Sequence, residues 1–136
     1  MCTSNYFTIV DLMKSTTAER LKIDNQPSDE VKEELRITVC RLNLISLIAH
    51  AYGVSIRVTS GYRCKRLNAA VGGVPNSLHM QGRAVDFVVS DDEIKHKLHD
   101  ALKEEACIKT LGICELIEYP SFIHVGFLRY SLDVKK

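Results

Sequence analysis

Apolar residues recur at helical spacing over a long stretch in the first half of the chain. Between residues 30 and 51 they return mainly every three or four positions, which predicts an amphipathic helix. Ser28 stands where the N-cap is expected, and acidic residues follow it in the first turns, where the helix dipole favours negative charge. Gly53 follows the last apolar position and is expected to end the helix.

The pattern changes to strict alternation directly after this helix. Residues 54–59 alternate Val, Ile and Val with Ser, Arg and Thr, which is the period of a half-buried strand. Three further strands are predicted, at 83–89, 114–119 and 122–130, the last two joined by a turn at Pro120 and Ser121. Two more helices are predicted, a short one over 64–73 and a longer one over 90–106 that Ser90 caps. This order predicts an α+β fold with a mainly antiparallel sheet and flanking helices.

Length and charge narrow the picture further. A chain of 136 residues fits a single domain, 1–136. Lys and Arg total 18 against 17 Asp and Glu, a net charge of +1, which provides no electrostatic footprint for nucleic acid or an anionic membrane. Neither is therefore an expected partner, and the sequence does not predict an oligomeric state.

The cysteines bear on the compartment of the protein. There are five, without a CxxC pair, at Cys2, Cys40, Cys64, Cys107 and Cys114. Scattered cysteines in odd number argue against a disulfide framework and against a thiolate zinc site, so we expect reduced thiols in a cytosolic protein. The first residues show no basic segment followed by a long apolar core. We therefore expect the protein to be cytoplasmic as synthesised and to need delivery if its target lies outside.

Candidate chemistry comes from two histidines and an aspartate. His79 and Asp86 are seven positions apart, and His124 lies in the apolar stretch FIHVGF. Imidazole nitrogen and carboxylate oxygen are ligands that zinc accepts, and catalytic zinc sites commonly use three of them. On spacing alone, a satisfied core histidine remains an alternative for His124. The other three histidines lie on predicted helices and are expected to be solvated: His50, His96 and His99.

A longer motif contains all three residues. The stretch SGYRCKRLNAAVGGVPNSLHMQGRAVDF, followed by FIHVGF, resembles the zinc D-Ala-D-Ala peptidases of the M15 class, which share the fold of the Hedgehog signalling domain. The chain is similar in particular to a short phage and bacterial branch, whose members often open with a segment like residues 5–28. The resemblance extends from about Asn5 to Phe127 and therefore covers nearly the whole chain.

The resemblance implies roles for five residues. His79, Asp86 and His124 would hold Zn²⁺, although the same ligand set also accepts cobalt, nickel or manganese. Arg63 would contact the substrate carbonyl or the oxyanion that forms when water attacks it, with a structural salt bridge as the alternative. Ser77 would lie at the substrate-binding edge.

One position departs from the pattern of better-known members. Many of them carry an Asp or Glu three residues before the last zinc histidine, where it accepts the proton of the attacking water. Here that residue is Ser121, whose hydroxyl cannot serve as this base near neutral pH without activation. Glu118 is the expected catalytic base, while Glu115 and a site without a base remain open alternatives.

Two functions follow from these expectations. The first is a zinc metallopeptidase that cuts the stem or cross-link peptides of bacterial peptidoglycan, as a D-Ala-D-Ala carboxypeptidase or an endolysin-type endopeptidase of a phage. The second is a catalytically silent zinc-binding member that acts as a peptidoglycan-binding or virion structural protein. A fourth protein ligand, from Cys64 or Cys114, would favour the silent member, because structural zinc sites are usually closed by four ligands.

Overall fold

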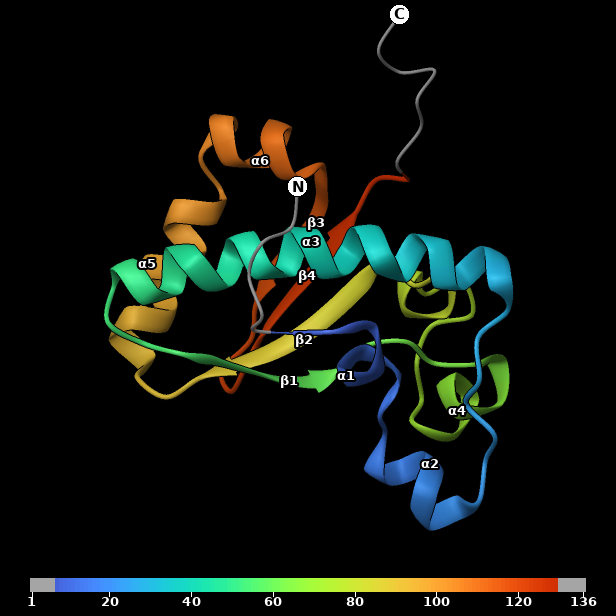
Figure 1. Ribbon diagram of the computed structural model, residues 1–136. Coiled ribbons are helices and arrows are strands. Elements are labelled where there is room, and N and C mark those ends of the chain that lie inside the picture. The colour runs from blue at the N-terminus through green and yellow to red at the C-terminus, as the bar shows by residue number, and fades with distance from the viewer. Residues whose placement is uncertain (1–6, 130–136) are drawn as a thin grey trace, which may run out of the picture.

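Four antiparallel strands form the centre of the structure. The computed structural model describes residues 7–129 (Figure 1). The strands are β1 (Ile56–Ser60), β2 (Ala84–Val89), β3 (Ile113–Glu118) and β4 (Ile123–Phe127). They pair in the order β1-β2-β4-β3, and every neighbouring pair is antiparallel. The predicted α+β fold with an antiparallel sheet is therefore confirmed, and each strand lies within or close to its predicted range.

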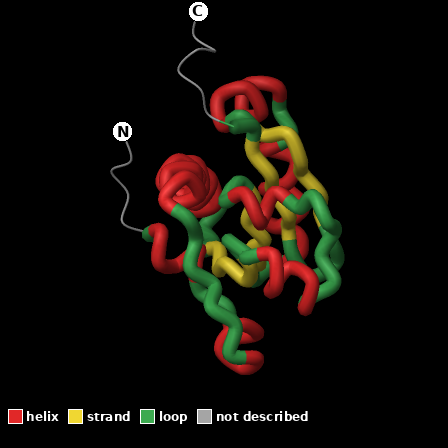
Figure 2. The backbone as a smooth tube through the Cα atoms, turned by 90° about the vertical axis from the view of Figure 1, so that its right-hand side faces the viewer, coloured by secondary structure: helices red, strands yellow, loops and turns green. Residues whose placement is uncertain are grey.

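One long helix covers one face of this sheet. Helix α3 (Asp29–Ala51) crosses in front of the strands in Figure 1 and is seen end-on beside them in Figure 2. The hydroxyl of Ser28 accepts a hydrogen bond from the backbone N–H of Val31 at 3.3 Å, which confirms the predicted cap. Leu42 and Ile45 of α3 are fully buried in one core with Phe87 of β2. The apolar side of the helix thus covers the sheet, as its periodicity predicted.

The alternating direction of side chains along the central strands β2 and β4 determines which residues face away from α3. Val85 and Phe87 of β2, with Val125 of β4, belong to the fully buried core. Since successive side chains in a strand point to opposite faces, Asp86 and His124 point to the other face. These two residues are direct partners in the β2–β4 ladder. A carboxylate and an imidazole therefore lie side by side at the centre of the face that α3 leaves uncovered.

The helix predicted over 90–106 is two helices. Helix α5 (Asp92–Leu102) is followed, after a short turn, by α6 (Glu105–Leu111), and the cap of α5 is Asp91, not Ser90. The break lets Leu102 and Leu111 both reach the core, where they are buried.

The other elements pack around the loop that follows β1. They are α1 (Ile9–Met13), α2 (Thr16–Leu21), α4 (Lys65–Ala70) and the 3₁₀ helix η1 (Leu78–Gln81). Helix α4 confirms the short helix predicted over 64–73, while the other three were not predicted. The backbone N–H of Tyr62 donates to the carbonyl of Leu12 in α1 at 2.6 Å, and Leu12 is fully buried. Helix α1 therefore packs against the loop that follows β1 and holds its backbone in place.

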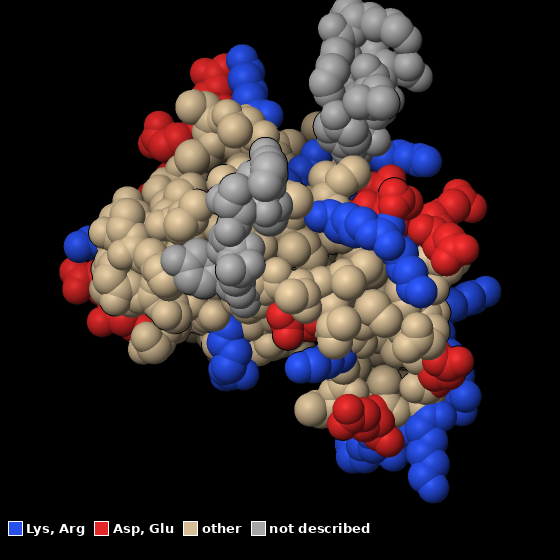
Figure 3. All heavy atoms as spheres, viewed as in Figure 1, with Lys and Arg blue, Asp and Glu red and all other residues tan. Residues whose placement is uncertain are grey.

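The surface agrees with the balanced composition. On the face shown in Figure 3, side chains of both signs lie intermixed around a broad uncharged area. Within residues 7–129, no helix has the length and apolar character needed to cross a bilayer. The four cysteines of this range are free thiols, as predicted, whereas Cys2 lies outside the described residues.

Candidate metal centre

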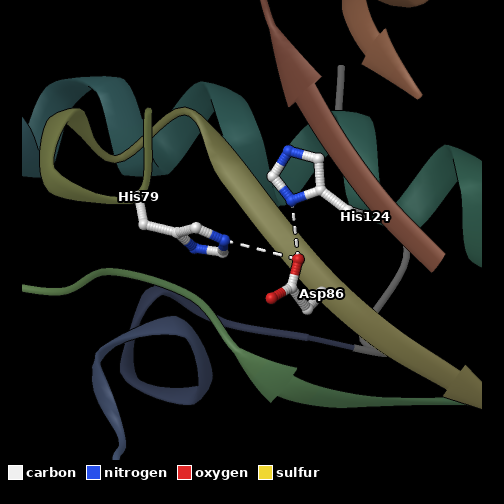
Figure 4. A group of neighbouring side chains, drawn as sticks. All are labelled: His79, Asp86 and His124. Carbon is white, nitrogen blue, oxygen red and sulfur yellow. Dashed lines mark hydrogen bonds and ion pairs between the residues drawn. The ribbon is translucent and has the colours of Figure 1, made fainter. Parts of the chain in front are cut away.

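The three predicted ligands converge from three different elements. His79 comes from η1, Asp86 from β2 and His124 from β4 (Figure 4). Asp86 Oδ1 lies 2.7 Å from His124 Nδ1 and 3.3 Å from His79 Nε2. One ligand atom from each residue lies within 4.8 Å of the other two. The structure thus brings together in space the residues that the sequence singled out.

His79 is oriented by the backbone of the neighbouring loop. Its Nδ1 lies 2.7 Å from the carbonyl oxygen of Gly61, which can only accept, so Nδ1 carries the proton and donates it. The lone pair of Nε2 therefore points into the cluster. This atom is buried and makes no hydrogen bond. Asp86 Oδ1 lies 3.3 Å away, but a carboxylate oxygen has no proton to donate to a lone pair. A buried nitrogen lone pair without a donor is costly, and a metal ion would satisfy it.

His124 lies between two carboxylates. Its Nδ1 faces Asp86, and its Nε2 lies 2.8 Å from Oε1 of Glu115 on β3. Burial lowers the pKa of His124, but the hydrogen bonds to Asp86 and Glu115 outweigh it and raise this pKa above its usual value. When Nδ1 binds a metal, Nε2–H donates to Glu115, which is the usual support of a ligating histidine.

The electrostatics of Asp86 favour its charged form. Burial raises the pKa of Asp86, but the hydrogen bond from His124 and the close approach of both histidines outweigh this and lower it to about 2. Asp86 is therefore an anionic ligand at neutral pH, as metal binding requires. Two imidazole nitrogens and one carboxylate oxygen fit zinc with one position left for water or substrate. Within the described part of the chain, neither Cys64 nor Cys114 joins this group of donor atoms.

Arg63 lies directly beside the cluster. Its Nε donates to Ser60 Oγ at 3.1 Å, one Nη1–H donates to Asn68 Oδ1 at 3.0 Å, and Nη2 is 3.6 Å from Asp86 Oδ2. Burial lowers the pKa of Arg63 and Asp86 raises it, yet a guanidinium keeps its charge at neutral pH. Arg63 is thus held in one orientation, next to the cleft and in ion-pair range of a candidate ligand.

Ser77 also lies at this site, but its hydroxyl has a structural task. The residue is buried, and its Oγ accepts a hydrogen bond from the backbone N–H of His79 at 3.1 Å. This bond caps η1 and thereby fixes the backbone that carries His79. Ser77 lines the cleft, and the contact that the structure shows is with the backbone of His79 in η1. A contact of Ser77 with substrate stays a prediction.

The structure does not bring Glu118 to the centre, which corrects the expected catalytic base. Ile117 is the ladder partner of His124, so Glu118 points to the opposite, helix-covered face of β3. Its Oε1 lies 2.9 Å from His96 Nδ1 and 3.8 Å from His99 Nδ1, both on α5. His99 is half-buried by this packing, so the expectation of a solvated residue is also wrong.

Glu115 occupies the place that was expected for Glu118. A register shift between Ile113 and Glu115 in the β3–β4 ladder precedes it, and its carboxylate lies over Gly126 of β4. A Cβ atom on Gly126 would lie 2.6 Å from Glu115 Oε1 and 2.9 Å from Leu78 Cδ1. The missing side chain at 126 therefore lets Glu115 reach His124. Glu115 is two residues before Ile117, the ladder partner of His124, so the two side chains lie on the same face of β3. The sequence alone does not show which residue of β3 pairs with His124.

The donor atoms open into a cleft of about 470 Å³. The polar residues that line it are Arg63, Asn76, Ser77, His79, Asp86, Glu115 and His124. The apolar lining residues are Val74, Leu78, Ile117, Tyr119 and Phe122. A concave site with convergent polar groups among apolar residues has the form of a small-ligand or peptide site.

Comparison with known families agrees with this geometry. The family model of peptidase M15 matches residues 5–126, which include all three candidate ligands and Arg63. The chain belongs to the peptidase M15 family. No curated protein matches it. Membership of the M15 family supports a peptidase, and the His-Asp-His cluster offers this M15 protein a place for the metal.

Proposed function

We propose that this protein is a zinc-dependent peptidase that hydrolyses peptide bonds in the stem or cross-link peptides of bacterial peptidoglycan. Membership of the M15 family supports the peptidase class. The observation that carries the metal assignment is the buried, unpartnered Nε2 of His79, which points at the same place as Asp86 Oδ1 and His124 Nδ1. Zinc bound there would polarise a carbonyl and lower the pKa of water to about 7.

The protein holds the ligands in place before any metal binds. The Gly61 carbonyl fixes the ring of His79, and Glu115 accepts from the ring of His124. Such outer contacts select the tautomer and orientation of ligating imidazoles. Asp86 supplies the negative charge of the ligand set, because its pKa lies far below neutrality.

Arg63 is placed to stabilise negative charge that develops on the carbonyl oxygen of the substrate. Ser60 and Asn68 each occupy one N–H of its guanidinium, so the group does not need to be reoriented during the reaction. A fixed cation at the edge of a partly buried site acts more strongly on the transition state than a mobile one in water.

We assign the proton transfer to Glu115. Its Oε1 accepts from His124 Nε2–H, which leaves Oε2 to take the proton of the attacking water and pass it to the leaving amine. With Asp86 engaged as a ligand, Glu115 is the remaining carboxylate among the described residues that line the cleft. The absence of an acid at Ser121 is therefore compatible with catalysis.

The silent, wall-binding or virion-structural member remains the second candidate, and Ser121 is the observation that favours it. The donor set weighs against it, since three protein ligands next to an open cleft resemble a catalytic centre more than a closed structural one. The two candidates differ in whether the zinc-loaded protein cuts peptide bonds.

The test combines zinc analysis with peptidoglycan digestion. Wild-type protein should contain about one zinc per chain and release new amino termini from purified peptidoglycan. His79→Ala should lose both properties, while the control His50→Ala, an exposed histidine on α3, should keep both. If wild-type protein binds zinc but releases no amino termini from walls of several chemotypes, the peptidase is excluded and the silent member is supported.

A further inference from the structure

A groove lies along the free edge of the sheet. Strand β1 is at the end of the strand order and pairs on one side only, with β2. Four consecutive residues of β1, Ile56–Thr59, line a cavity of about 490 Å³. Because successive side chains of a strand point to opposite faces, a cavity that all four residues line lies against the backbone edge. The other lining residues come from α1, which lies beside β1 in Figure 1, and from its flanks: Phe7, Asp11, Lys14, Ser15 and Thr16.

The backbone at this edge has hydrogen-bonding groups to offer. In an antiparallel ladder, the residues of an edge strand that do not bond their partner point their N–H and C=O groups outward. Within residues 7–129, the backbone groups of Ile56–Thr59 make no hydrogen bond to any element except β2. An extended peptide that pairs with the outward groups becomes an added strand, and main-chain hydrogen bonds then provide the affinity.

This cavity leads to the metal centre. A second cavity, of about 190 Å³, shares four lining residues with the first, and we call the two together the edge groove: Lys14, Ser15, Thr16 and Thr59. Arg63 lines the second cavity and also the cleft that contains the three candidate ligands. Ser60, the last residue of β1, is the ladder partner of Asp86. The chain from Ile56 to Arg63 thus lines all three spaces in succession, and a peptide that lies along β1 is directed to the metal centre.

The edge groove carries a surplus of positive charge. Its lining residues include three cations and one carboxylate: Lys14, Arg57, Arg63 and Asp11. The carboxylate is already engaged, since Asp11 Oδ2 accepts from the N–H of Thr8 at 2.8 Å and Oδ1 is 3.7 Å from Lys14 Nζ. Arg57 is exposed, and no carboxylate of the described chain lies within ion-pair distance of it. A groove with this charge suits a peptide that carries acidic side chains.

We infer that the edge groove is a second binding site for the substrate: it holds an extended, acidic stretch of the peptide, remote from the bond that is cut, as an added strand on β1. This inference rests on the proposed function, because it takes the occupant to be part of the peptide substrate. Binding energy from a remote part of a substrate helps to orient the bond that reacts. The edge groove would therefore align the peptide with the metal centre before the reaction begins.

Peptide binding tests the charge of the edge groove. The probe is an alanine-rich peptide of about six residues with two glutamates, long enough to pair with all five residues of β1, and the matched probe carries glutamines instead. NMR titration of the zinc-loaded Glu115→Gln variant should show at least about threefold tighter binding of the glutamate peptide, a modest factor because solvent screens exposed ion pairs. Adding Lys14→Glu and Arg57→Glu should abolish this preference. The control pair Lys103→Glu and Lys109→Glu changes the net charge equally at exposed positions outside the groove and should keep it.

Pairing with the strand edge predicts an alternating pattern. In an added antiparallel strand, every second N–H of the peptide faces β1. Methyl groups on these nitrogens should weaken binding about fivefold or more, whereas methyl groups on the intervening nitrogens should change Kd less than about twofold. Hydrogen exchange of the outward N–H groups of Ile56–Thr59 should slow when the peptide binds. An equal effect of methylation at every position, or unchanged exchange along β1, would overturn the inference.

Digestion of soluble peptidoglycan fragments separates this inference from the proposed function. In otherwise wild-type zinc-loaded protein, Lys14→Glu with Arg57→Glu should raise KM about threefold or more and leave kcat unchanged, because neither residue lines the cleft at the metal centre. If fragments are cut with an unchanged KM, the peptidase stands and the edge groove is not a substrate site. If the peptide binds along β1 but no fragment is cut, the proposed function fails, and the substrate role of the groove fails with it.

Sugar chains are the competing occupant. Glycan strands from which the peptides have been removed should not displace the glutamate peptide from the zinc-loaded Glu115→Gln variant, because they lack the amide backbone that pairs with a strand edge. Displacement of the peptide by these strands would show that the groove binds sugar, and it would overturn the inference.

Discussion

Two groups of histidines and carboxylates lie on opposite faces of the same sheet. On the open face, His79 and His124 meet Asp86 and Glu115. On the helix-covered side, two histidines of α5 meet Glu118. Glu115 and Glu118 stand only three residues apart in β3, yet an odd separation in a strand sends them to opposite faces.

The two groups differ in how their donor atoms converge more than in burial or composition. In the open-face group a fully enclosed Nε2 faces Asp86 Oδ1, and three ligand atoms converge within 4.8 Å. In the other group the His96 side chain is 64% exposed. The Nδ1 of His99 is buried and makes no hydrogen bond either, but it lies 3.8 Å from Glu118 Oε1, and among the described residues no set of three ligand atoms converges there. The comparison teaches that a histidine–carboxylate cluster becomes a metal-site candidate when rigid elements bury its donors and direct them to one point.

The largest expected effect comes from removing the Asp86 carboxylate of the open-face group, with removal of the Glu118 carboxylate as the control. Asp86→Ala should lower the zinc content from about one per chain to below about a tenth and abolish activity, because two neutral imidazoles alone bind zinc weakly. Glu118→Ala should leave the zinc content unchanged. Elemental analysis of the dialysed proteins measures both, and circular dichroism checks that they fold. A full equivalent of zinc in Asp86→Ala would show that the metal lies elsewhere.

The next effect separates the two glutamates of β3. Glu115→Gln keeps an oxygen that accepts from His124 Nε2–H but loses the basic group, so kcat should fall about 10²- to 10⁴-fold with zinc retained. Glu118→Gln should change kcat less than about twofold, because its carboxylate faces α5. Steady-state kinetics and zinc analysis give the answer. Full activity in Glu115→Gln would show that Glu115 is not the catalytic base and only orients the ring of His124.

A smaller effect is expected from filling the space that Glu115 uses. Gly126→Ala would set a Cβ 2.6 Å from Glu115 Oε1, so we expect kcat to fall and the protein to lose about 1–3 kcal/mol of stability from overpacking. The control Gly53→Ala adds a methyl group to open space but at φ +82°, so it should cost about 1–2 kcal/mol without changing kcat. Urea unfolding and kinetics compare the two. If both variants keep wild-type kcat, the glycine does not position Glu115.

The smallest effect concerns the solvent-exposed pair. The hydrogen bond to Glu118 raises the pKa of His96, with the nearby Asp100 adding to it. The raised pKa means that this pair stabilises the fold fully below the usual histidine pKa and stops doing so as the pH rises through the folded value. The gain is small, because solvent screens exposed pairs. Titration of the His96 ring by NMR should show a lower pKa in Glu118→Gln, and an unchanged value would contradict the pairing.

Local patterns predicted the elements where one signal dominated. Helix α3 and its cap at Ser28 followed from periodicity and N-cap chemistry, and the strands followed from alternation. The break between α5 and α6 was missed because both halves contain good helix formers. Local patterns do not show where the chain must turn for Leu102 and Leu111 both to reach the core. The sequence offered both Ser90 and Asp91 as N-cap residues for α5. In the structure Asp91 is the N-cap, and its carboxylate accepts a hydrogen bond from the backbone N–H of Ile94.

The residue pattern alone was enough to predict the candidate ligands and the motif that contains them. It also indicates that Asp86 and His124 face away from the core, because their neighbours in the strands are apolar. It did not determine which glutamate joins them. Leu116 and Ile117 are both apolar, so the sequence does not show which residues of β3 face the core and which face the cleft. The pairing with β4, which includes a register shift between Ile113 and Glu115, decides this. The lining of the cleft likewise includes Val74 and Tyr119, which only the folded chain brings to the same site. The direction of a side chain follows from local structure, whereas contact between distant segments depends on the tertiary fold.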